Sequence, residues 1–296
     1  MSAGNGNKNG NGYWGEIERN WREAVLDLKD RVAVVTGGAR GIGRTTSYAL
    51  ALEGIKAIAV VDMGDDVDEI CVNANQKLGR EVLVPFRGDV TQREFRRQVF
   101  ATMEQRFGPV SICVPAAGVT RDRLAVRLDK TTGEVDMYPE EEFRRVMEID
   151  LTAPIYWGLE TIASVAKHRQ HAGKGRWDPN EGIQGVIVLI GSVSSAGNKG
   201  QISYATAKAG LEGAQATMAA EAVYYGVRCA IIHPGYTDTA MVRALGDQFI
   251  NTNVIPFTQL RRLLRPEEIA HAICFLIRNA SVSGQLWADA GWHPAP

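Results

Sequence analysis

Cysteine is scarce in this sequence, and its placement excludes several kinds of site. Four cysteines are spread over 296 residues, and none forms a C-x-x-C pair. Most of them lie inside apolar runs such as SICV, RCAII and AICFL, where a thiol behaves as a small hydrophobic group. The pattern predicts buried thiols in a reducing compartment, with no metal centre and no disulfide framework. The cysteines are Cys71, Cys113, Cys229 and Cys274.

The chain also lacks an excess of charge and any long hydrophobic run. Lysine and arginine total 33 against 34 for aspartate and glutamate, which argues against a nucleic-acid or anionic-membrane partner. The N-terminal segment MSAGNGNKNGNG has neither the basic nor the apolar stretch of a signal peptide. The longest apolar runs, such as AIAVV and VIVLI, are strand-sized and too short to span a membrane. We therefore expect a cytoplasmic protein.

The N-terminal region divides into two segments. Residues 1–12 form an Asn/Gly tract that is too polar to pack, and we expect it to be disordered. Over residues 13–29, apolar side chains recur three and four positions apart, which predicts an amphipathic helix. Its two tryptophans need cover, either from the body of this subunit or from a neighbouring one. The apolar positions are Trp14, Ile17, Trp21, Ala24 and Leu28.

Residues 30–296 read as one α/β domain. Short β-branched runs alternate with longer helical stretches, and the runs are apolar throughout rather than alternating. Such runs indicate strands of a parallel sheet that is buried on both faces by helices. We expect a doubly wound sheet of about seven strands in a single domain. The candidate strands are 32–36, 57–62, 81–86, 110–114, 185–191, 227–233 and 285–290.

Two segments interrupt this alternation and look like insertions. Residues 127–139 carry a Thr-Gly turn between short alternating flanks, which predicts a surface hairpin. Residues 167–185 are basic and glycine-rich without periodicity, which predicts a loop. His168 and His171 have a spacing that metal ligands use, but no third ligand accompanies them, so we expect a solvated helix end.

A glycine-rich turn follows the first predicted strand and opens a helix. Glycine permits the tight turn and lets the backbone approach a pyrophosphate, while the helix N-terminus presents free N–H groups to it. The motif TGGARGIG therefore predicts a dinucleotide-binding loop. Its candidate cofactor-binding residues are Gly37, Ala39, Arg40, Gly41, Ile42 and Gly43.

Asp62 ends the second predicted strand about 20 residues after that loop, where a carboxylate can accept from the adenosine ribose hydroxyls. The carboxylate would repel a 2′-phosphate, whereas Arg40 could bind one. We expect NAD(H) to be favoured and leave NADP(H) open. Met63 and Val90 belong to the same candidate site, and Asp89 is placed to contact adenine or to cap a turn.

Tyr204 and Lys208 lie one helical turn apart in SYATAKAG. A nearby ammonium lowers the pKa of a phenol, and a phenol tuned in this way can act as general acid or base. Ser192 follows the strand at 185–191, at the sheet edge where parallel-sheet enzymes place their sites. Further candidates follow the next strand: Pro234, Gly235, Thr237 and Thr239.

With these motifs in order, the chain resembles the single-domain branch of the short-chain dehydrogenase/reductase family, especially 3-oxoacyl-[acyl-carrier-protein] reductases. The resemblance runs from about Lys29 to Trp292 and rests on TGGARGIG, GDV, AAGVTRD, IGSVSSAGNKGQISYATAKAG and HPG. It implies a Rossmann fold with strand order 3-2-1-4-5-6-7 and assembly as a homotetramer or homodimer. It also implies that Tyr204 is the acid/base, that Lys208 binds the nicotinamide ribose, and that Ser192 and Thr237 contact the substrate oxygen and the carboxamide.

Three departures from the family pattern bear on the site. Pro115 and Ala116–Ala117–Gly118 stand where Asn-Asn-Ala-Gly is usual, although Ala116, Ala117 and Gly118 remain cofactor-binding candidates. Asp150 replaces the asparagine that completes the catalytic tetrad, so a carboxylate would serve the proton relay. The interval from Ser192 to Tyr204 is one residue shorter than is common, which makes Ser194 the fallback for the serine.

The substrate is left open among a 3-oxoacyl thioester and a small or cyclic secondary alcohol. Residues 236–264 would form a flap whose apolar residues either wall a pocket or pack a lid helix. Basic residues near the pocket mouth either attract an acidic partner or form a solvated face. A different class, a Rossmann-fold nucleotide sensor or scaffold that has lost catalysis, is the alternative that the Asn-Asn and Asp150 changes favour. The apolar and basic residues are Met241, Leu245, Phe249, Ile255, Phe257, Arg121, Arg123 and Arg127.

Overall fold

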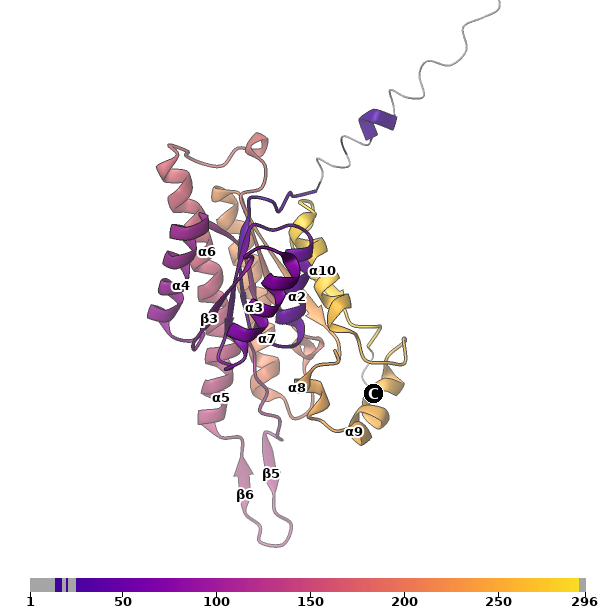
Figure 1. The fold of residues 1–296 in the computed structure, drawn as a ribbon. Coiled ribbons are helices and arrows are strands. Elements are labelled where there is room, and N and C mark those ends of the chain that lie inside the picture. The colour runs from indigo at the N-terminus through magenta and orange to yellow at the C-terminus, as the bar shows by residue number, and fades with distance from the viewer. Residues whose placement is uncertain (1–13, 18–19, 21–24, 293–296) are drawn as a thin grey trace, which may run out of the picture.

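One parallel sheet forms the centre of the molecule (Figure 1). The computed structural model describes residues 14–17, 20 and 25–292. The strands of this sheet are β1 (Val32–Thr36), β2 (Ala57–Asp62), β3 (Leu83–Arg87), β4 (Val110–Pro115), β7 (Gly185–Ile190), β8 (Val227–Pro234) and β9 (Gln285–Ala288). Their order in space is β3-β2-β1-β4-β7-β8-β9, and every neighbouring pair is parallel. This order confirms the expected doubly wound Rossmann fold.

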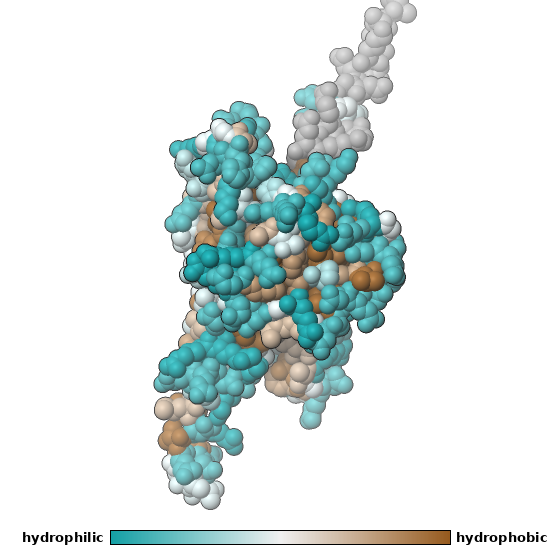
Figure 2. All heavy atoms as spheres, turned by 60° about the vertical axis from the view of Figure 1, so that its left-hand side comes forward, coloured by the Kyte–Doolittle hydropathy of each residue, from teal (hydrophilic) through white to brown (hydrophobic). Residues whose placement is uncertain are grey.

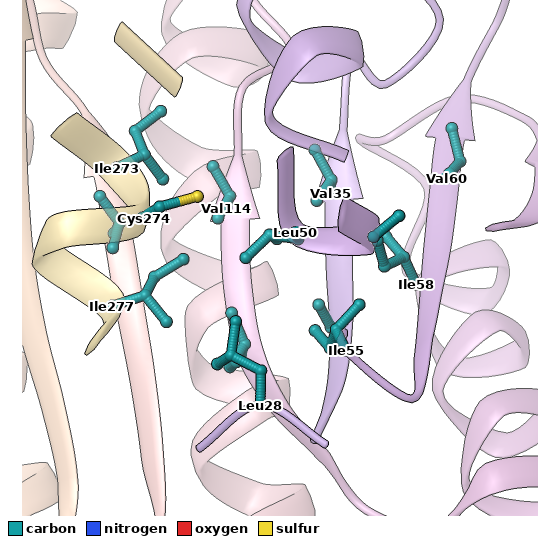
Figure 3. Packing of buried hydrophobic residues seen from close by; sticks show 14 of the residues in the cluster. Leu28, Val35, Leu50, Ile55, Ile58, Val60, Val114, Ile273, Cys274 and Ile277 are labelled. Carbon is teal, nitrogen blue, oxygen red and sulfur yellow. The ribbon is translucent and has the colours of Figure 1, made fainter. Parts of the chain in front are cut away.

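Helices cover both faces of the sheet, which makes three layers. The long helices are α2 (Gly41–Leu52), α3 (Val67–Leu78), α4 (Arg93–Phe107), α6 (Ala153–His171), α7 (Ile202–Ala222) and α10 (Pro266–Arg278). One set of alternating strand residues packs with α2, α3 and α10, and the other set packs with α4, α6 and α7. Figure 3 shows the first of these layers, where Leu50 of α2 and Ile273 of α10 lie over Val114 of β4.

The strands form where the sequence predicts them because both of their faces are covered. All five residues of β1 and all six of β4 and β7 are buried. Several boundaries differ from the prediction by one or two residues; the largest shifts are at β3, which begins at Leu83 rather than at residue 81, and at β9, which ends at Ala288 rather than at residue 290. The Asn75 side chain of α3 accepts hydrogen bonds from the backbone N–H groups of Val82 and Leu83, at 2.9 Å each, and so occupies the donors at the strand entry.

A two-stranded hairpin projects from the body between β4 and α5 (Glu140–Met147), at the lower end of Figure 1. Its strands are β5 (Val126–Leu128) and β6 (Val135–Met137), paired antiparallel. The pairs Val126–Met137 and Leu128–Val135 place four exposed apolar side chains on one face, and Figure 2 shows hydrophobic residues among hydrophilic ones on this projection. The second segment predicted to be an insertion differs at its start: α6 continues to His171, and the irregular loop begins only at residue 172.

The predicted helix over residues 13–29 is wrong at its C-terminal end. Val25 pairs antiparallel with Asn279, and the backbone N–H of Leu26 donates to the Arg278 carbonyl at 2.8 Å. These bonds pair backbone groups of an extended segment with the end of α10. Leu28 is buried against the core, with 2% of its surface exposed. Tertiary pairing therefore overrides the helical periodicity here. Residues 14–17 are helical, whereas Trp21, Ala24 and the predicted disordered tract at 1–12 lie outside the described residues.

Candidate active site

The glycine turn between β1 and α2 is a backbone cradle that excludes side chains. Gly37 has a φ of +63°, and a Cβ there would lie 2.8 Å from the N and Cα atoms of Ala117. At Gly43, a Cβ would lie 2.3 Å from the Gly37 carbonyl oxygen. Both positions therefore require glycine. The first turn of α2 contains no acidic residue, so its N–H groups face the turn without a competing carboxylate.

Asp62 holds this turn in place at the end of β2. Its Oδ2 accepts from the Ala39 backbone N–H at 3.0 Å, and its Oδ1 accepts from the Gly64 N–H at 2.9 Å. Arg40 points outward with 67% of its side chain exposed, and its guanidinium lies 3.8 Å from the Asp66 carboxylate. The Ala39 side chain is buried in the core. Ala39 therefore stabilises the turn through its backbone N–H bond to Asp62.

Residues that follow β3 and β4 lie across from the glycine turn and line the same cavity. The backbone N–H of Ala117 donates to the Thr36 hydroxyl at 3.1 Å, which ties the residues after β4 to the end of β1. Val90 is fixed by the Trp157 indole, whose Nε1 donates to the Val90 carbonyl at 3.0 Å. Asp89 accepts from the Thr91 backbone and hydroxyl at 2.9 and 2.8 Å, so it caps a turn where it stands.

Ser192, Tyr204 and Lys208 converge beyond the ends of β7 and β8. Lys208 is buried, and its ammonium donates to the Ile190 carbonyl at 3.1 Å and lies 5.3 Å from the centre of the Tyr204 ring. Ser192 and Tyr204 line the same cavity, and the Ser192 hydroxyl accepts from the Ser194 N–H at 3.1 Å. Ser194 instead donates its hydroxyl to Gln201 at 2.8 Å, so the geometry favours Ser192 over the fallback.

Asp150 lies beneath this pair in a π-helical turn, Glu148–Thr152, between α5 and α6. Its carboxylate is fully buried, 3.4 Å from the Lys208 ammonium, and it accepts from the Val119 backbone N–H at 2.9 Å. A Cβ at Gly118 would lie 2.8 Å from Asp150 Oδ2, so the glycine makes room for the carboxylate. π-Helical turns of this kind are frequent at functional sites.

Burial decides the direction of the pKa shifts in this cluster. Burial raises the pKa of Tyr204 above its ordinary value; Asp150 and Asp122 add to the rise, while Lys208 and Ser192 oppose it. Lys208 lowers the pKa of Tyr204 as the sequence predicts, but burial outweighs it and the net direction is upward. Asp150 raises the pKa of Lys208 against the effect of burial, and burial raises the pKa of Asp150 despite Lys208.

Two adjoining cavities meet at these side chains. The larger, about 480 Å³, runs from the glycine turn to Lys208. The smaller, about 120 Å³, lies between Ser192 and the flap, and both cavities are lined by Tyr204. The predicted residues that line the larger cavity are Gly37, Arg40, Gly41, Ile42, Gly43, Asp62, Met63, Asp89, Val90, Ala116, Ala117, Gly118, Asp150, Tyr204, Lys208 and Thr239. Those that line the smaller one are Ile42, Ser192, Ser194, Tyr204, Pro234, Gly235, Thr237, Thr239, Met241 and Leu245.

The flap, residues 236–264, serves both of the roles considered for it. Met241 of α8 (Ala240–Arg243) and Leu245 wall the smaller cavity. Ile255 instead packs with Ile250 of α9 (Asp247–Asn253), and the Phe257 ring lies 6.3 Å from Trp292. Two of the basic residues predicted near the mouth of the pocket, Arg121 and Arg123, form ion pairs with carboxylates.

Two ion pairs join arginines that precede the hairpin to acidic residues near them. Arg121 lies 2.9 Å from Glu142, and Arg123 pairs with Asp136 across the hairpin. An attraction for acidic partners therefore gains no support from these two side chains.

Several residues at the site escape prediction from the sequence. Arg145 and Ile149 also line the larger cavity, although no motif marks them, and so does Val119 of the motif AAGVTRD. His233 is fully buried beneath the serine, with its Nδ1 3.2 Å from the Ser192 carbonyl oxygen and its ring stacked on Trp287 at 4.3 Å. Its position directly before Pro234-Gly235 at the end of a strand is a signal that could have placed it at the site.

The described residues hold neither a spanning segment nor a metal cluster. No described helix is long and apolar enough to cross a membrane. Among the same residues, no group of three or more His, Cys, Asp and Glu side chains is placed to hold a metal ion.

Comparisons with known proteins agree with this geometry. The family model for short chain dehydrogenases matches residues 31–249. The chain is 32% identical to the 3-oxoacyl-[acyl-carrier-protein] reductase FabG of Vibrio cholerae over 85% of this chain and 91% of that protein. It is 31% identical to the cis-4-hydroxycyclohexanecarboxylate dehydrogenase of Sinomonas cyclohexanicum, over 90% and 97%. A crystal structure of a short-chain type dehydrogenase/reductase from Mycobacterium marinum superposes with a TM-score of 0.74 at 25% identity, covering 90% of this chain and 96% of that one.

Proposed function

The chain belongs to the short-chain dehydrogenase/reductase family of NAD(P)-dependent oxidoreductases, and from that premise we propose that it interconverts a ketone and a secondary alcohol with Tyr204 as the acid/base. The observation that carries the proposal is the position of Tyr204. It lines both cavities, and the Lys208 ammonium lies 5.3 Å from its ring. A phenol at that junction can exchange a proton with a substrate oxygen held in the smaller cavity.

The larger cavity fits a nicotinamide dinucleotide because the glycine turn after β1 lines it. A Cβ atom at Gly37 or Gly43 would collide with backbone atoms, so the turn has no side chains there and its backbone can approach a pyrophosphate. When bound, the cofactor supplies or accepts the hydride. The glycine turn and the α2 N-terminus would hold its pyrophosphate, Asp62 its adenosine ribose, and Lys208 its nicotinamide ribose. The exposed position of Arg40 and the fixed carboxylate of Asp62 favour NAD(H) over NADP(H).

In the reduction direction, the residues of this site would transfer one proton to the substrate oxygen. Ser192 would bind the carbonyl oxygen by its hydroxyl, and Tyr204 would give its phenolic proton to that oxygen as the carbon is reduced. Lys208, held as an ammonium by Asp150, would stabilise the phenolate that remains. A proton from solvent would then pass through Lys208 to the tyrosine, with Asp150 as a hydrogen-bond acceptor in that relay. The raised pKa of Tyr204 keeps the phenol protonated at neutral pH, which suits it as the proton donor.

Two substrate classes fit the smaller cavity, and we place the 3-oxoacyl thioester first. The similarity to FabG supports it, and the opening of the cavity past the flap would let the thioester trail outward. The cavity volume of about 120 Å³ with the apolar side chains of Met241, Val242 and Leu245 also suits a small cyclic secondary alcohol. A catalytically impaired sensor is disfavoured, because burying Lys208 and Asp150 as a pair is costly and a sensor needs neither.

We further propose a cytoplasmic homotetramer or homodimer. All four cysteines are free and buried, which suits a reducing compartment. On α6, Tyr156 and Leu159 are 48% and 41% exposed, and Ile202 at the start of α7 is 44% exposed. Exposed large apolar side chains on neighbouring helices are consistent with a surface that a second copy covers.

Nicotinamide absorbance during incubation with a short 3-oxoacyl thioester or a cyclic ketone tests the proposal. We expect NADH to be oxidised faster than NADPH, and the better of the two substrates identifies the class. Faster use of NADPH would show that Arg40 rather than Asp62 decides cofactor choice. Binding of both cofactors without turnover of either substrate class would favour the sensor instead.

A further inference from the structure

The backbone just before Tyr204 is held by the segment that carries the hairpin. The Arg123 backbone N–H donates to the Gly200 carbonyl at 2.9 Å. The Gln201 side-chain amide donates to the Asp122 carboxylate at 2.8 Å. These bonds join residues 121–138, called here the hairpin segment, to residues 200–203, called here the pre-tyrosine turn.

Tyr138 makes the tie that comes nearest to Tyr204. Its hydroxyl donates to the Arg121 carbonyl at 2.8 Å and lies 2.8 Å from the Ser203 hydroxyl, which must therefore donate to it. Ser203 is fully buried and directly precedes Tyr204. The Tyr138 hydroxyl thus closes the base of the hairpin and fixes the first turn of α7 through one oxygen atom.

A second tie reaches the serine side of the site. Gln201 accepts from the Ser194 hydroxyl at 2.8 Å, and the Ser194 backbone N–H donates to the Ser192 hydroxyl at 3.1 Å. The hairpin segment is therefore connected to Ser192 through Gln201 and to Tyr204 through Ser203. Both groups that must meet the substrate oxygen depend on the same external support.

The loop between Ser192 and Tyr204 contains two glycines with positive φ, and the hydrogen bonds from the hairpin segment fix its position. Gly197 and Gly200 have φ angles of +103° and +85°, so this loop adopts backbone conformations that favour glycine. A misplacement of about 1 Å at reacting groups can cost on the order of 100-fold in rate. Side chains locked by packing and hydrogen bonds supply the required precision.

We propose that Tyr138 is a positioning residue, which holds Tyr204 in line with Ser192 by anchoring the pre-tyrosine turn to the hairpin segment. The inference rests on the proposed acid/base role of Tyr204. It gives the hairpin insertion a function, because the root of the hairpin braces the site while its strands remain exposed. Tyr138 lines neither cavity, so it acts through Ser203 and not on substrate or cofactor.

The test compares Tyr138→Phe, Ser203→Ala and the double variant with the unaltered chain. Loss of a hydrogen bond to a buried hydroxyl is expected to lower kcat by roughly tenfold in Tyr138→Phe. Cofactor affinity should be unchanged, because the larger cavity is not lined by the hairpin segment. The double variant should be no slower than the slower single variant, since both changes remove the same bond. Tyr224→Phe is the matched control, as that tyrosine is 48% exposed on another part of the surface.

Hydrogen–deuterium exchange over residues 197–207 separates this inference from the proposed function. The inference predicts faster exchange there in Tyr138→Phe and unchanged exchange in Tyr224→Phe, whether or not a substrate is turned over. Unchanged exchange, or additive losses of kcat in the double variant, would overturn the positioning role. A lack of turnover by the unaltered chain, with faster exchange in Tyr138→Phe, would instead contradict the proposed reaction and leave the brace supported.

Discussion

At the scale of single residues, the unusual feature of the site is a buried carboxylate beneath the tyrosine–lysine pair. Asp150 is fully buried and lies 3.4 Å from the Lys208 ammonium. It keeps the lysine charged, but it also adds to the raised pKa of Tyr204. The two effects oppose each other at the phenol, because the ammonium stabilises a phenolate and the carboxylate destabilises it. This balance predicts how the rate depends on pH.

Oxidation of an alcohol requires the phenolate, so its rate should rise with pH and reach a plateau above the pKa of Tyr204. Asp150→Asn removes a negative charge that raises this pKa, so the pKa falls and the rise should occur at lower pH. The measurement is kcat for alcohol oxidation across the alkaline range. Glu141→Gln, an equal charge change on the exposed side of α5, should leave the profile in place. An unshifted profile in Asp150→Asn would contradict the electrostatic role of the carboxylate.

Which residues the sequence could identify depends on how local their chemistry is. Gly37 and Gly43 and the Tyr204–Lys208 pair carry their roles in short motifs, so they can be placed without coordinates. The direction of the Tyr204 pKa cannot be read in this way, because burial and the approach of Asp150 arise from segments distant in the chain. Arg145 reaches the site for the same tertiary reason, whereas the position of His233 before Pro234-Gly235 is a local signal.

At the scale of elements, the glycine turn shows how steric exclusion shapes a binding site. Gly37 and Gly54 both have positive φ, at +63° and +88°. A Cβ at Gly37 would collide with the Ala116–Ala117 backbone, whereas a Cβ at Gly54 meets nothing within 4 Å among the described residues. An alanine at either position would be strained by the positive φ, but only at position 37 would its Cβ atom also collide with backbone atoms.

Gly37→Ala is expected to cost more than Gly54→Ala for this reason. Strain in both variants should lower the free energy of unfolding by about 1 kcal/mol, and the collision should add about 1–3 kcal/mol in Gly37→Ala alone. Cofactor affinity should fall at least about tenfold in Gly37→Ala only, because the turn must shift away from the pyrophosphate. Thermal unfolding and cofactor titration measure both effects. Equal affinity in the two variants would show that the turn does not hold the cofactor.

Elements were predictable where the local pattern and the tertiary environment agree. The strands of the parallel sheet are apolar throughout and buried on both faces, so pattern and burial coincide. They disagree at residues 25–28, where a helical spacing of apolar residues is overridden by pairing of Val25 with Asn279. The partner lies 254 positions away in the chain, beyond what any local pattern encodes.

At the scale of the whole molecule, the extended segment at residues 25–28 is held against the sheet domain. Figure 3 shows Leu28 beside the cluster that contains Leu50, Ile55 and Ile277. The backbone bond from Leu26 to Arg278 and the burial of Leu28 act together at the C-terminal end of α10. Residues 25–28 and the last long helix therefore pack together.

Leu28→Ala should consequently destabilise the entire domain. Removing a buried leucine side chain costs about 2–5 kcal/mol, which is a large part of the stability of a typical domain. Leu52→Ala is the control, because that side chain is 79% exposed and its loss should change stability by no more than about 0.5 kcal/mol. Denaturant unfolding measures both. A loss below about 1 kcal/mol in Leu28→Ala would show that the segment is only loosely attached.

The central claim is that Tyr204 transfers the proton, and it is tested most directly by comparing Tyr204→Phe with the unaltered chain under saturating NADH and ketone. The phenylalanine ring keeps the shape of the site and removes the proton. We expect kcat to fall by about 10²–10⁴-fold while NADH affinity stays within about twofold. A variant that retains the turnover of the unaltered chain would contradict the account.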